Sequence, residues 1–332
     1  MLDYVTRRFV YMLLMIAAMS LVAFIIIQLP PGDYLTMYVR QLEASGEILD
    51  ESEIESLRRQ YGLDQPQHIR YLKWVGGMFR GDFGRSVQWH KSVIDLVGER
   101  LLLTIVISLG ATVFTYAVAV SVGIYSATHQ YSLFDYSVTI VGFVGLATPN
   151  FLLALVLMIV FNNAFGISIG GLFSPEYSTA PWSLGKVWDM IKHLPVPIIV
   201  LGTAGTAGVI RVMRGMLLDE LRKQYVITAR TKGLSESRLL FRYPVRLALN
   251  PIVSTVGWVL PAIVSGDTIT ALVLSLPTVG PLLFRALLTE DMYLAGTIVM
   301  FLCFLTIIGM FVSDMILAAI DPRIRFEKAN VT

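Results

Sequence analysis

One segment of the chain, residues 219–249, combines charged side chains with a glycine and helical spacing. Lys223 and Ile227 are about one turn apart, which predicts a helix that continues into this segment from the apolar stretch before it. Gly233 can take a left-handed conformation and end that helix, and Ser235 can then cap a second, shorter one. A helix–glycine–helix presents charge beside an apolar edge, which suits docking into a groove on a partner protein.

A simpler interpretation of the same segment is a basic anchor at the lipid headgroups. Residues 210–250 hold nine basic residues against three acids. A uniform basic anchor would need neither Gly233 nor the acidic Glu236. The sequence therefore favours docking over simple anchoring.

Motifs that would let this chain catalyse a reaction by itself are missing from the sequence. There is no G-x-x-x-x-G-K-[ST] phosphate loop, because the one lysine that follows a glycine, Lys186, precedes a valine. There is no H-E-x-x-H, and the four histidines are far apart in sequence. Cys303 is the single cysteine, which excludes intrachain disulfides and cysteine-based zinc clusters. We expect no catalytic residue, no metal site and no cofactor bound by this chain.

Three polar or aromatic residues within apolar stretches are candidates for a path through the membrane: Asp267, Trp258 and Asn150. An ionised carboxylate in the bilayer costs about 3 kcal/mol or more, so Asp267 should face a bundle interior or a water-filled cavity. It could line or gate a path, or it could be a structural partner for nearby hydroxyls. Trp258 could stack on a solute, but packing is the simpler role. Asn150 could satisfy a backbone group freed by Pro149.

The composition excludes an ordinary soluble enzyme. Of 332 residues, 55% are hydrophobic and 15% charged, and the mean hydropathy is +0.67. Soluble domains carry about 25% charged residues. Six apolar stretches approach the length of about 20 residues that crosses a bilayer: residues 9–29, 101–126, 137–164, 195–218, 251–275 and 292–320. We predict an all-α polytopic membrane protein with six transmembrane helices, in a single domain over residues 1–332.

Lysine and arginine predict the orientation of these spans. Arg7 and Arg8 precede the first span, and residues 210–250 are strongly basic. Residues 30–100 carry nine basic residues against eleven acids. We therefore place both termini and the 219–249 loop in the cytoplasm, and the 30–100 segment on the extracytoplasmic side.

The outer segment, residues 30–100, contains a predicted helix over residues 69–79. Ile69, Leu72, Val75 and Phe79 would share one face of it, accompanied by the aromatic residues Tyr71 and Trp74. Such a helix could lie at the membrane surface, or its apolar face could simply pack as a cap over the spans.

Several motifs along the chain have the order and spacing of a known family. The loop contributes Tyr225, Thr228, Ala229, Arg230, Lys232, Gly233, Leu234, Ser235 and Glu236. Further motifs are Pro31-Gly32-Asp33, Tyr61-Gly62-Leu63-Asp64-Gln65-Pro66, Arg80-Gly81-Asp82-Phe83-Gly84-Arg85-Ser86, Ala147-Thr148-Pro149-Asn150-Phe151 and Asp321-Pro322-Arg323. With these motifs the chain resembles the permease subunits of binding-protein-dependent ABC importers, in the dipeptide/oligopeptide/nickel branch.

This resemblance implies a type I importer permease in a prokaryotic cytoplasmic (inner) membrane. The implied partners are a second homologous permease, usually as a heterodimer, two cytoplasmic ATPases that hold ATP and magnesium, an extracytoplasmic substrate-binding protein and membrane lipid, with no nucleic acid. The loop would then be the element that couples the permease to the ATPases. The residues assigned to this coupling are Thr228, Ala229, Arg230, Lys232, Gly233, Leu234, Ser235, Glu236, Leu239 and Leu240.

The substrate is less clearly indicated than the role. Short peptides are the expected cargo of this branch. However, Ala271 stands where the branch commonly has an acid, and Leu276 where it has a tryptophan. An oligosaccharide or another small solute is therefore the alternative substrate. An ion-coupled secondary transporter is the rival from another class, and it would predict more spans or intramembrane charge pairs. A membrane-embedded enzyme would require a nucleophile or metal constellation, which the sequence does not display.

Overall fold

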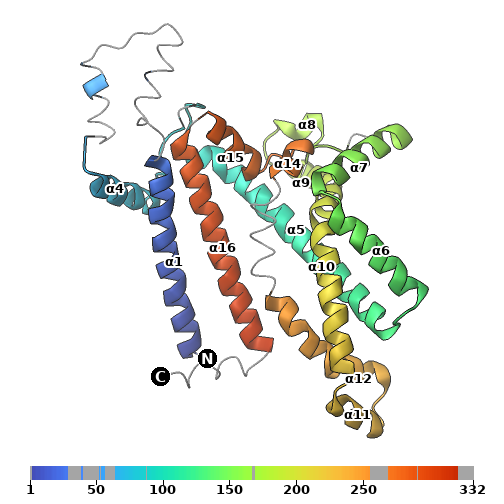
Figure 1. Ribbon diagram of the computed structural model, residues 1–332. Coiled ribbons are helices and arrows are strands. Elements are labelled where there is room, and N and C mark those ends of the chain that lie inside the picture. Colours follow the sequence, from blue (N-terminus) through green and yellow to red (C-terminus); the bar gives the residue numbers. More distant parts are fainter. Residues whose placement is uncertain are drawn as a thin grey trace. The chain divides into compact units, whose positions relative to one another are not determined.

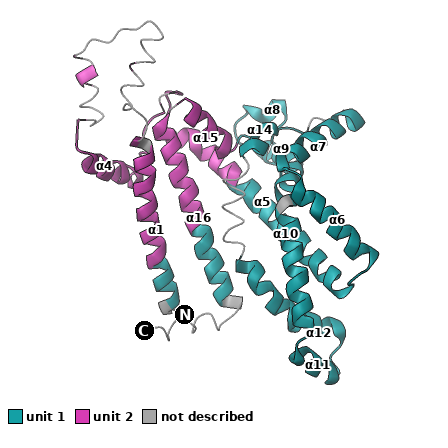
Figure 2. Ribbon diagram, in the orientation of Figure 1, with its two compact units in different colours: residues 1–9, 105–277, 308–332 teal, residues 10–104, 278–307 magenta. Residues whose placement is uncertain are grey.

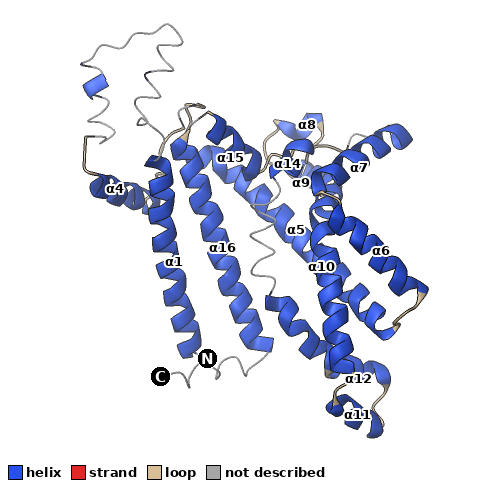
Figure 3. Cartoon of the chain, viewed as in Figure 1, coloured by secondary structure: helices blue, strands red, loops and turns tan. Residues whose placement is uncertain are grey.

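The computed structural model describes residues 2–28, 39, 52, 54–56, 64–86, 88–166, 169–254, 268–289 and 291–320. These residues form helices joined by loops, with one isolated antiparallel bridge between Arg85 and Ser92 (Figures 1 and 3). The helices in chain order are α1 (Leu2–Gln28), α4 (Gln67–Phe79), α5 (Val93–Thr128), α6 (Leu133–Ala147), α7 (Asn150–Phe165), α8 (Pro175–Ser178), α9 (Leu184–His193), α10 (Pro195–Leu221), α11 (Gln224–Thr231), α12 (Glu236–Arg242), α14 (Thr268–Val273), α15 (Val279–Leu288) and α16 (Met292–Ile320). The all-α prediction is confirmed.

Three helices in the described part of the chain, α1, α5 and α16, are each long and apolar enough to cross a membrane. α16 has the predicted bounds, whereas α5 extends the predicted 101–126 stretch at both ends. Two bent helix pairs raise the number of candidate spans to five. The fifth predicted stretch, residues 251–275, falls largely on residues 255–267, outside the described residues. The count of six therefore stays a prediction.

The third predicted span is not one continuous helix. α6 and α7 meet at an angle of 105° where a single helix over residues 137–164 was expected. The break lies at Thr148 and Pro149. Proline disfavours helical dihedrals in the residue before it, and Thr148 has extended values of φ −89° and ψ 119°. Pro149 then stands at the N-cap of α7, where its missing N–H breaks no helical hydrogen bond. Pro149 was expected to free backbone groups within the span, but the bend itself was not predicted.

The chain divides into two compact units, with boundaries within α1, α5 and α16 and in the loop between α14 and α15 (Figure 2). Unit 1 comprises residues 1–9, 105–277 and 308–332, and unit 2 comprises residues 10–104 and 278–307. This division does not test whether residues 1–332 form a single domain, which stays a prediction.

The core of unit 1 joins α5, α10 and a helical stretch at residues 244–254. Its fully buried members include Ala119 of α5, Met213 and Leu217 of α10 and Ala248. The two long helices come close at Gly123, where an added Cβ would lie 2.8 Å from the Cβ of Met213. A larger residue at this position would separate the helices, so glycine is required there by the packing.

A smaller apolar cluster in unit 2 holds the outer helix α4. Trp74 is buried beside Ala23 and Phe24 of α1, and Tyr71 and Val75 pack against the same cluster. The predicted helix is therefore present, and Tyr71, Trp74 and Val75 hold it to this cluster, while the placement at the membrane surface stays a prediction. Only Val75 of the four predicted residues takes part, whereas Ile69, Leu72 and Phe79 are 37%, 66% and 89% exposed. The packed face is defined by neighbours on other helices, which helical periodicity alone does not reveal.

The motif at residues 80–86 forms a turn that is pinned to the start of α16. Gly84 has a φ of +82°, and its N–H donates to the Asp82 carboxylate at 3.0 Å. The hydroxyl of Ser86 donates to Asp291, which is 1% exposed. Asp291 also accepts from the backbone N–H groups of Gln88 and Leu294, both at 3.3 Å. One buried carboxylate thus caps α16 and holds this outer turn.

Candidate coupling helices and translocation path

The predicted helix–glycine–helix is present as α11 and α12 (Figure 1). A continuous helix from α10 into α11 was predicted from the sequence. The structure instead has a break between the two helices. α10 ends at Leu221, and Lys223 takes extended dihedrals of φ −72° and ψ 147° before α11 begins. This turn allows Val226 and Ala229 of α11 to pack against Leu239 of α12. Burial of these apolar groups outweighs the local preference for continued helix.

Gly233 makes the connection between α11 and α12. Its φ of +78° is in the left-handed region, as predicted, and its N–H donates to the carbonyl of Arg230 at 3.0 Å. The N–H of Leu234 reaches back to the carbonyl of Ala229 at 3.4 Å. Ser235 occupies the N-cap position of α12, as predicted, although its side chain makes no cap hydrogen bond. The turn is therefore stabilised by backbone bonds and by the small apolar core behind it.

The ten residues assigned to coupling divide into an inner and an outer set. Ala229 and Leu239 are buried in the core between α11 and α12, and Leu240 packs against the core of unit 1. Leu234 is half-buried at the edge of the α11–α12 core. The exposed members are Thr228, Arg230, Lys232, Gly233, Ser235 and Glu236. The inner set shapes the two helices, and the outer set is available to a partner.

Exposed apolar side chains lie on the same two helices. Ile227 of α11 is 44% exposed and Phe241 of α12 is 61% exposed. Neither residue is among the ten assigned to coupling from the sequence, although Phe241 ends the 228–241 stretch that contains them. The sequence feature that could have identified them is an apolar residue beside charged residues on a short helix, which can bury few apolar side chains in its own small core. The surface therefore combines charge with apolar groups, as expected for a docking element.

An ion pair that the sequence analysis did not predict spans the turn at Gly233. The Arg230 side chain donates from Nε to Glu236 Oε1 at 2.6 Å and from Nη2 to Oε2 at 3.0 Å. These hydrogen bonds lower the pKa of the Glu236 carboxyl and raise the pKa of Arg230. Both side chains are exposed, so water or a partner protein can reach and replace the pair.

A second polar contact links α11 to the end of α10. The Tyr225 hydroxyl donates to the Glu220 carboxylate. Burial, followed by this hydrogen bond and the charge of Glu220, raises the pKa of the Tyr225 hydroxyl. Tyr225 therefore stays protonated and keeps donating across the turn at residues 222 and 223.

The path candidates are only partly within the described structure. Asp267 and Trp258 lie outside the described residues. Asn150 is half-buried and begins α7 directly after the bend at Pro149. Within the same unit α7 packs against α14, which begins one residue after Asp267. The structure thus brings Asn150's helix next to the helix that follows Asp267, but it does not bring the three candidates together.

The end of α14 is held by a contact with an outer loop. The N–H of Gly171 donates to the carbonyl of Leu274 at 2.6 Å, and Ser275 has a φ of +53°. Ala271 and Leu276, the positions at which this sequence departs from the peptide-branch pattern, are 7% and 3% exposed. Both side chains therefore pack inside the described structure.

Two family models match the chain. The model described as "binding-protein-dependent transport system inner membrane component" matches residues 119–326, and the model of the N-terminal part of such membrane components matches residues 1–110. The first model covers all helices from α6 to α16, including α11 and α12.

Individual proteins are similar over nearly their whole length. The oligopeptide transport system permease protein AppB of Bacillus subtilis (strain 168) is 31% identical over 330 residues, which cover 98% of this chain and 100% of that protein. The dipeptide transport system permease protein DppB of Alkalihalophilus pseudofirmus is 30% identical over 342 residues, with 98% and 100% covered. The peptidoglycan transport system permease protein YejB of Agrobacterium fabrum is 28% identical over 363 residues, with 99% of each chain covered.

Proposed function

The chain belongs to the family of binding-protein-dependent transport system inner membrane components, and on this premise we propose that it is the permease subunit of an ATP-driven importer of short peptides. The chain is a multi-pass membrane protein with several apolar helices. The observation that carries the substrate class is the full-length similarity to proteins named as oligopeptide and dipeptide permeases. Oligosaccharides remain the alternative that Ala271 and Leu276 suggest.

α11 and α12 are proposed as the element that couples this permease to its ATPases. Support comes from their small independent core, the left-handed Gly233 between them and the exposed set of charged and apolar side chains. In this proposal the ATPases bind α11 and α12 from the cytoplasm, hydrolyse ATP with magnesium in their own sites, and move these helices as a unit. Rigid-body gating would then expose the path first to one side of the membrane and afterwards to the other side.

The remaining partners follow from the same proposal. A second homologous permease would supply the other half of the path, and an extracytoplasmic binding protein would deliver the solute. The orientation is that predicted from charge, with both termini and α11–α12 in the cytoplasm of a prokaryotic cell. No cofactor or catalytic residue is assigned to this chain. Hydrolysis belongs to the ATPase subunits.

Asp267, Trp258 and Asn150 remain proposals for the lining of the path. Support for Asn150 is its place at the first turn of α7, immediately after a 105° bend. Bent helices with polar residues at the break are a common way to build a solute site within a membrane.

The first test is copurification from the native membrane in mild detergent. We expect a second six-span permease and two ATPases with phosphate-loop motifs, together with ATPase activity. The matched variants are Gly233→Trp, which puts a bulky residue at the left-handed turn, and Gly166→Trp, at a left-handed glycine in another loop. Gly233→Trp should lose the ATPases or their coupling, and Gly166→Trp should retain them. A folded chain without ATPases under several mild conditions would favour an ion-coupled transporter instead.

The substrate class is tested with the copurified binding protein and with transport. Proteoliposomes that contain the complex should accumulate a labelled di- or oligopeptide in an ATP-dependent manner. A labelled oligosaccharide of similar size is the comparison solute. Accumulation of the oligosaccharide alone would overturn the peptide assignment and leave the importer role intact.

A further inference from the structure

Asp135 in the first turn of α6 is a carboxylate surrounded by donors from three segments. It is 3% exposed. The hydroxyl of Ser126, near the end of α5, donates to Oδ1. The N–H of Tyr131, in the turn between α5 and α6, donates to Oδ2 at 3.0 Å. Arg214 of α10 donates to both oxygens. One side chain thus ties together the end of α5, the connecting turn, the start of α6 and α10.

The bonds from Arg214 form a two-pronged fork. Nε lies 2.8 Å from Oδ1 and Nη2 lies 2.7 Å from Oδ2. A bidentate pair fixes direction as well as distance, because both N–H groups must align with both oxygens. Arg214 follows Met213, which is fully buried in the core of unit 1. The fork therefore sits on a part of α10 that is itself held firmly.

Buried apolar side chains contribute little to the position of α6 within unit 1. Asp135 is its only buried residue, all of its residues being described. The core cluster of unit 1, as far as the structure describes it, contains no residue of α6. Phe134 contacts the ring of Tyr125 at 4.7 Å between centroids, beside the clamped end. α6 is therefore positioned at this end mainly by polar bonds and not by apolar packing.

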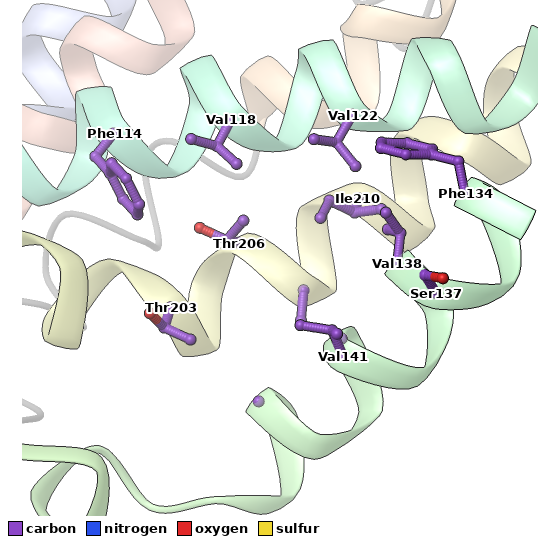
Figure 4. A pocket seen from close by; sticks show the side chains of 13 residues that line it. Phe114, Val118, Val122, Phe134, Ser137, Val138, Val141, Thr203, Thr206 and Ile210 are labelled. Carbon is purple, nitrogen blue, oxygen red and sulfur yellow. The ribbon is translucent and has the colours of Figure 1, made fainter. Parts of the chain in front are cut away.

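Beyond the clamped end, α6 contacts α10 through small residues, since Gly142 faces Ala207 and Gly145 faces Thr203. Beside these contacts, an apolar cavity of about 320 Å³ lies between α5, α6 and α10 (Figure 4). Val118 of α5, Val138 and Val141 of α6, and Thr206 and Ile210 of α10 line it. Unfilled space beside contacts between small residues leaves room for α6 to change its angle relative to α10. Its start, however, cannot move away from α10 while the fork is intact.

The fork is also close to the proposed coupling helices. Arg214 is seven residues before Leu221, the last residue of α10, which is about 10 Å along a helix. α11 begins three residues after Leu221. The Tyr225 hydroxyl bonds back to Glu220, and Leu240 of α12 packs on the same core as Met213. A displacement of α11 and α12 therefore acts directly on the stretch of α10 that carries Arg214.

We propose that Asp135 and Arg214 form a clamp that makes the start of α6 follow α10 when the coupling helices move. This inference rests on the proposed function, because it assigns the pair a role in passing ATPase motion to α6. Both are positioning residues, since neither is proposed to touch the solute. Without the clamp, α10 could still move with the ATPases, while α6 would lag behind and the path would open incompletely.

The test uses the complete importer complex in proteoliposomes, with Asp135→Asn, Arg214→Gln and the double variant. The double variant leaves no unpaired charge, so it serves if the single variants fold poorly. We expect ATP hydrolysis to persist and solute transported per ATP to fall about tenfold, the size of a typical coupling effect between sites. The matched control is Arg211→Gln, one turn earlier on α10. Arg211 contacts α6 at the Phe143 ring, 5.0 Å away, but both hydrogen bonds from α10 to Asp135 come from Arg214. Arg211→Gln therefore removes an arginine that contacts α6 and leaves the fork intact.

A distance measurement separates positioning from simple stability. Spin labels at Ile140 of α6 and Val212 of α10, both on exposed positions, are introduced with Cys303 replaced by serine. In the protein with Asp135 and Arg214 intact, the distance between the two labels should be the same with and without trapped nucleotide. It should change or broaden with nucleotide in the clamp variants. Arg214→Lys, which keeps the charge but loses the fork, should fall between them.

Each result decides for or against the clamp. An assembled Arg214→Gln or double variant with unaltered transport per ATP and an unaltered distance overturns it. Failure of all three variants to assemble, while Arg211→Gln assembles, shows a role in folding and overturns the role in coupling. If the unaltered chain carries no ATPases, the proposed function itself fails, which is a separate result.

Discussion

Two arginine–carboxylate pairs in this molecule have nearly the same geometry and opposite surroundings. In both, Nε and Nη2 of an arginine donate to the two oxygens of one carboxylate, at 2.8 and 2.7 Å for Arg214–Asp135 and at 2.6 and 3.0 Å for Arg230–Glu236. The side chain of Asp135 is 4% exposed, whereas that of Glu236 is 67% exposed. Bond lengths alone therefore do not separate a structural pair from a dispensable one.

The difference in exposure assigns the pairs different roles. Water competes for the exposed pair and screens it, so Arg230 and Glu236 can separate at little cost and bind a partner instead. Removing one member of the buried pair leaves a charge that neither water nor another group fully compensates. The buried pair suits a joint that must persist through a transport cycle, and the exposed pair suits a surface that docks and releases.

The largest effect on stability is expected from Asp135→Asn. The substitution leaves Arg214 without its carboxylate partner. Because the Arg214 side chain is 28% exposed, we expect a cost of about 3 kcal/mol, the lower end of the range for breaking a buried pair. Thermal unfolding of the purified complex in detergent should occur at a clearly lower temperature than for the control Arg211→Gln. Equal unfolding temperatures for the two variants would remove the proposed contrast between the pairs.

A smaller effect is expected at a buried carboxylate that has no arginine. Ser86→Ala removes one donor from Asp291 and leaves the N–H groups of Gln88 and Leu294 in place. A buried acceptor that loses one partner costs about 1–3 kcal/mol. The control is Ser178→Ala, since Ser178 is exposed and donates to the carbonyl of Pro175 at 2.9 Å. Thermal unfolding should place Ser86→Ala between the control and Asp135→Asn, and a loss larger than that of Asp135→Asn would show that burial matters more than charge here.

The turn beneath the exposed pair can be tested at Gly233. An added Cβ would meet no atom within 4 Å, so the cost of Gly233→Val lies in the backbone, at about 1–2 kcal/mol for an L-residue in the left-handed region. Gly233→Asn should cost less, because asparagine tolerates this region. The measurement is thermal unfolding together with the yield of copurified ATPase. Equal results for valine and asparagine would mean that side-chain bulk at the docking surface, and not the turn, determines binding.

The smallest effect on stability is expected from Glu236→Gln. Because the pKa of Glu236 is lowered in the folded protein, its contribution is fully present above its unfolded pKa and is lost as the pH falls through the lowered folded value. Arg230 stays charged throughout. The unfolding temperatures of the parent chain and the variant should therefore differ slightly at neutral pH and converge in acid or in high salt. A large difference at neutral pH would show that exposure does not weaken this pair.

Local properties of the chain could be predicted from its sequence. The bounds of α16 were predicted at both ends, because apolar length is a property of consecutive residues. The left-handed Gly233 and the start of α12 after Ser235 were also predicted, since both depend on conformational preferences of single residues. The continuation of α10 into α11 was wrong, because the packing of α11 on α12 requires a turn there.

Contacts between distant residues were beyond the sequence. Asp135 and Arg214 are 79 residues apart, and Ser86 and Asp291 are 205 apart. Nothing in the neighbourhood of either acid identifies its partner. The same limit applies to α4, whose helix was predicted while the choice between a membrane-surface position and a packed cap was left open.

The sequence by itself determined that this chain is an all-helical membrane protein and a member of its transport family. Apolar length, lysine and arginine distribution and ordered motifs are all written along the chain. Only the tertiary structure decided which acids are buried, where the chain bends between α6 and α7, and which face of α4 packs. The physical reason is that apolar side chains suit lipid and a protein interior equally well, so hydropathy marks a span without saying what it touches. Hydrogen bonds and ion pairs between helices supply that information, and they exist only once the chain has folded.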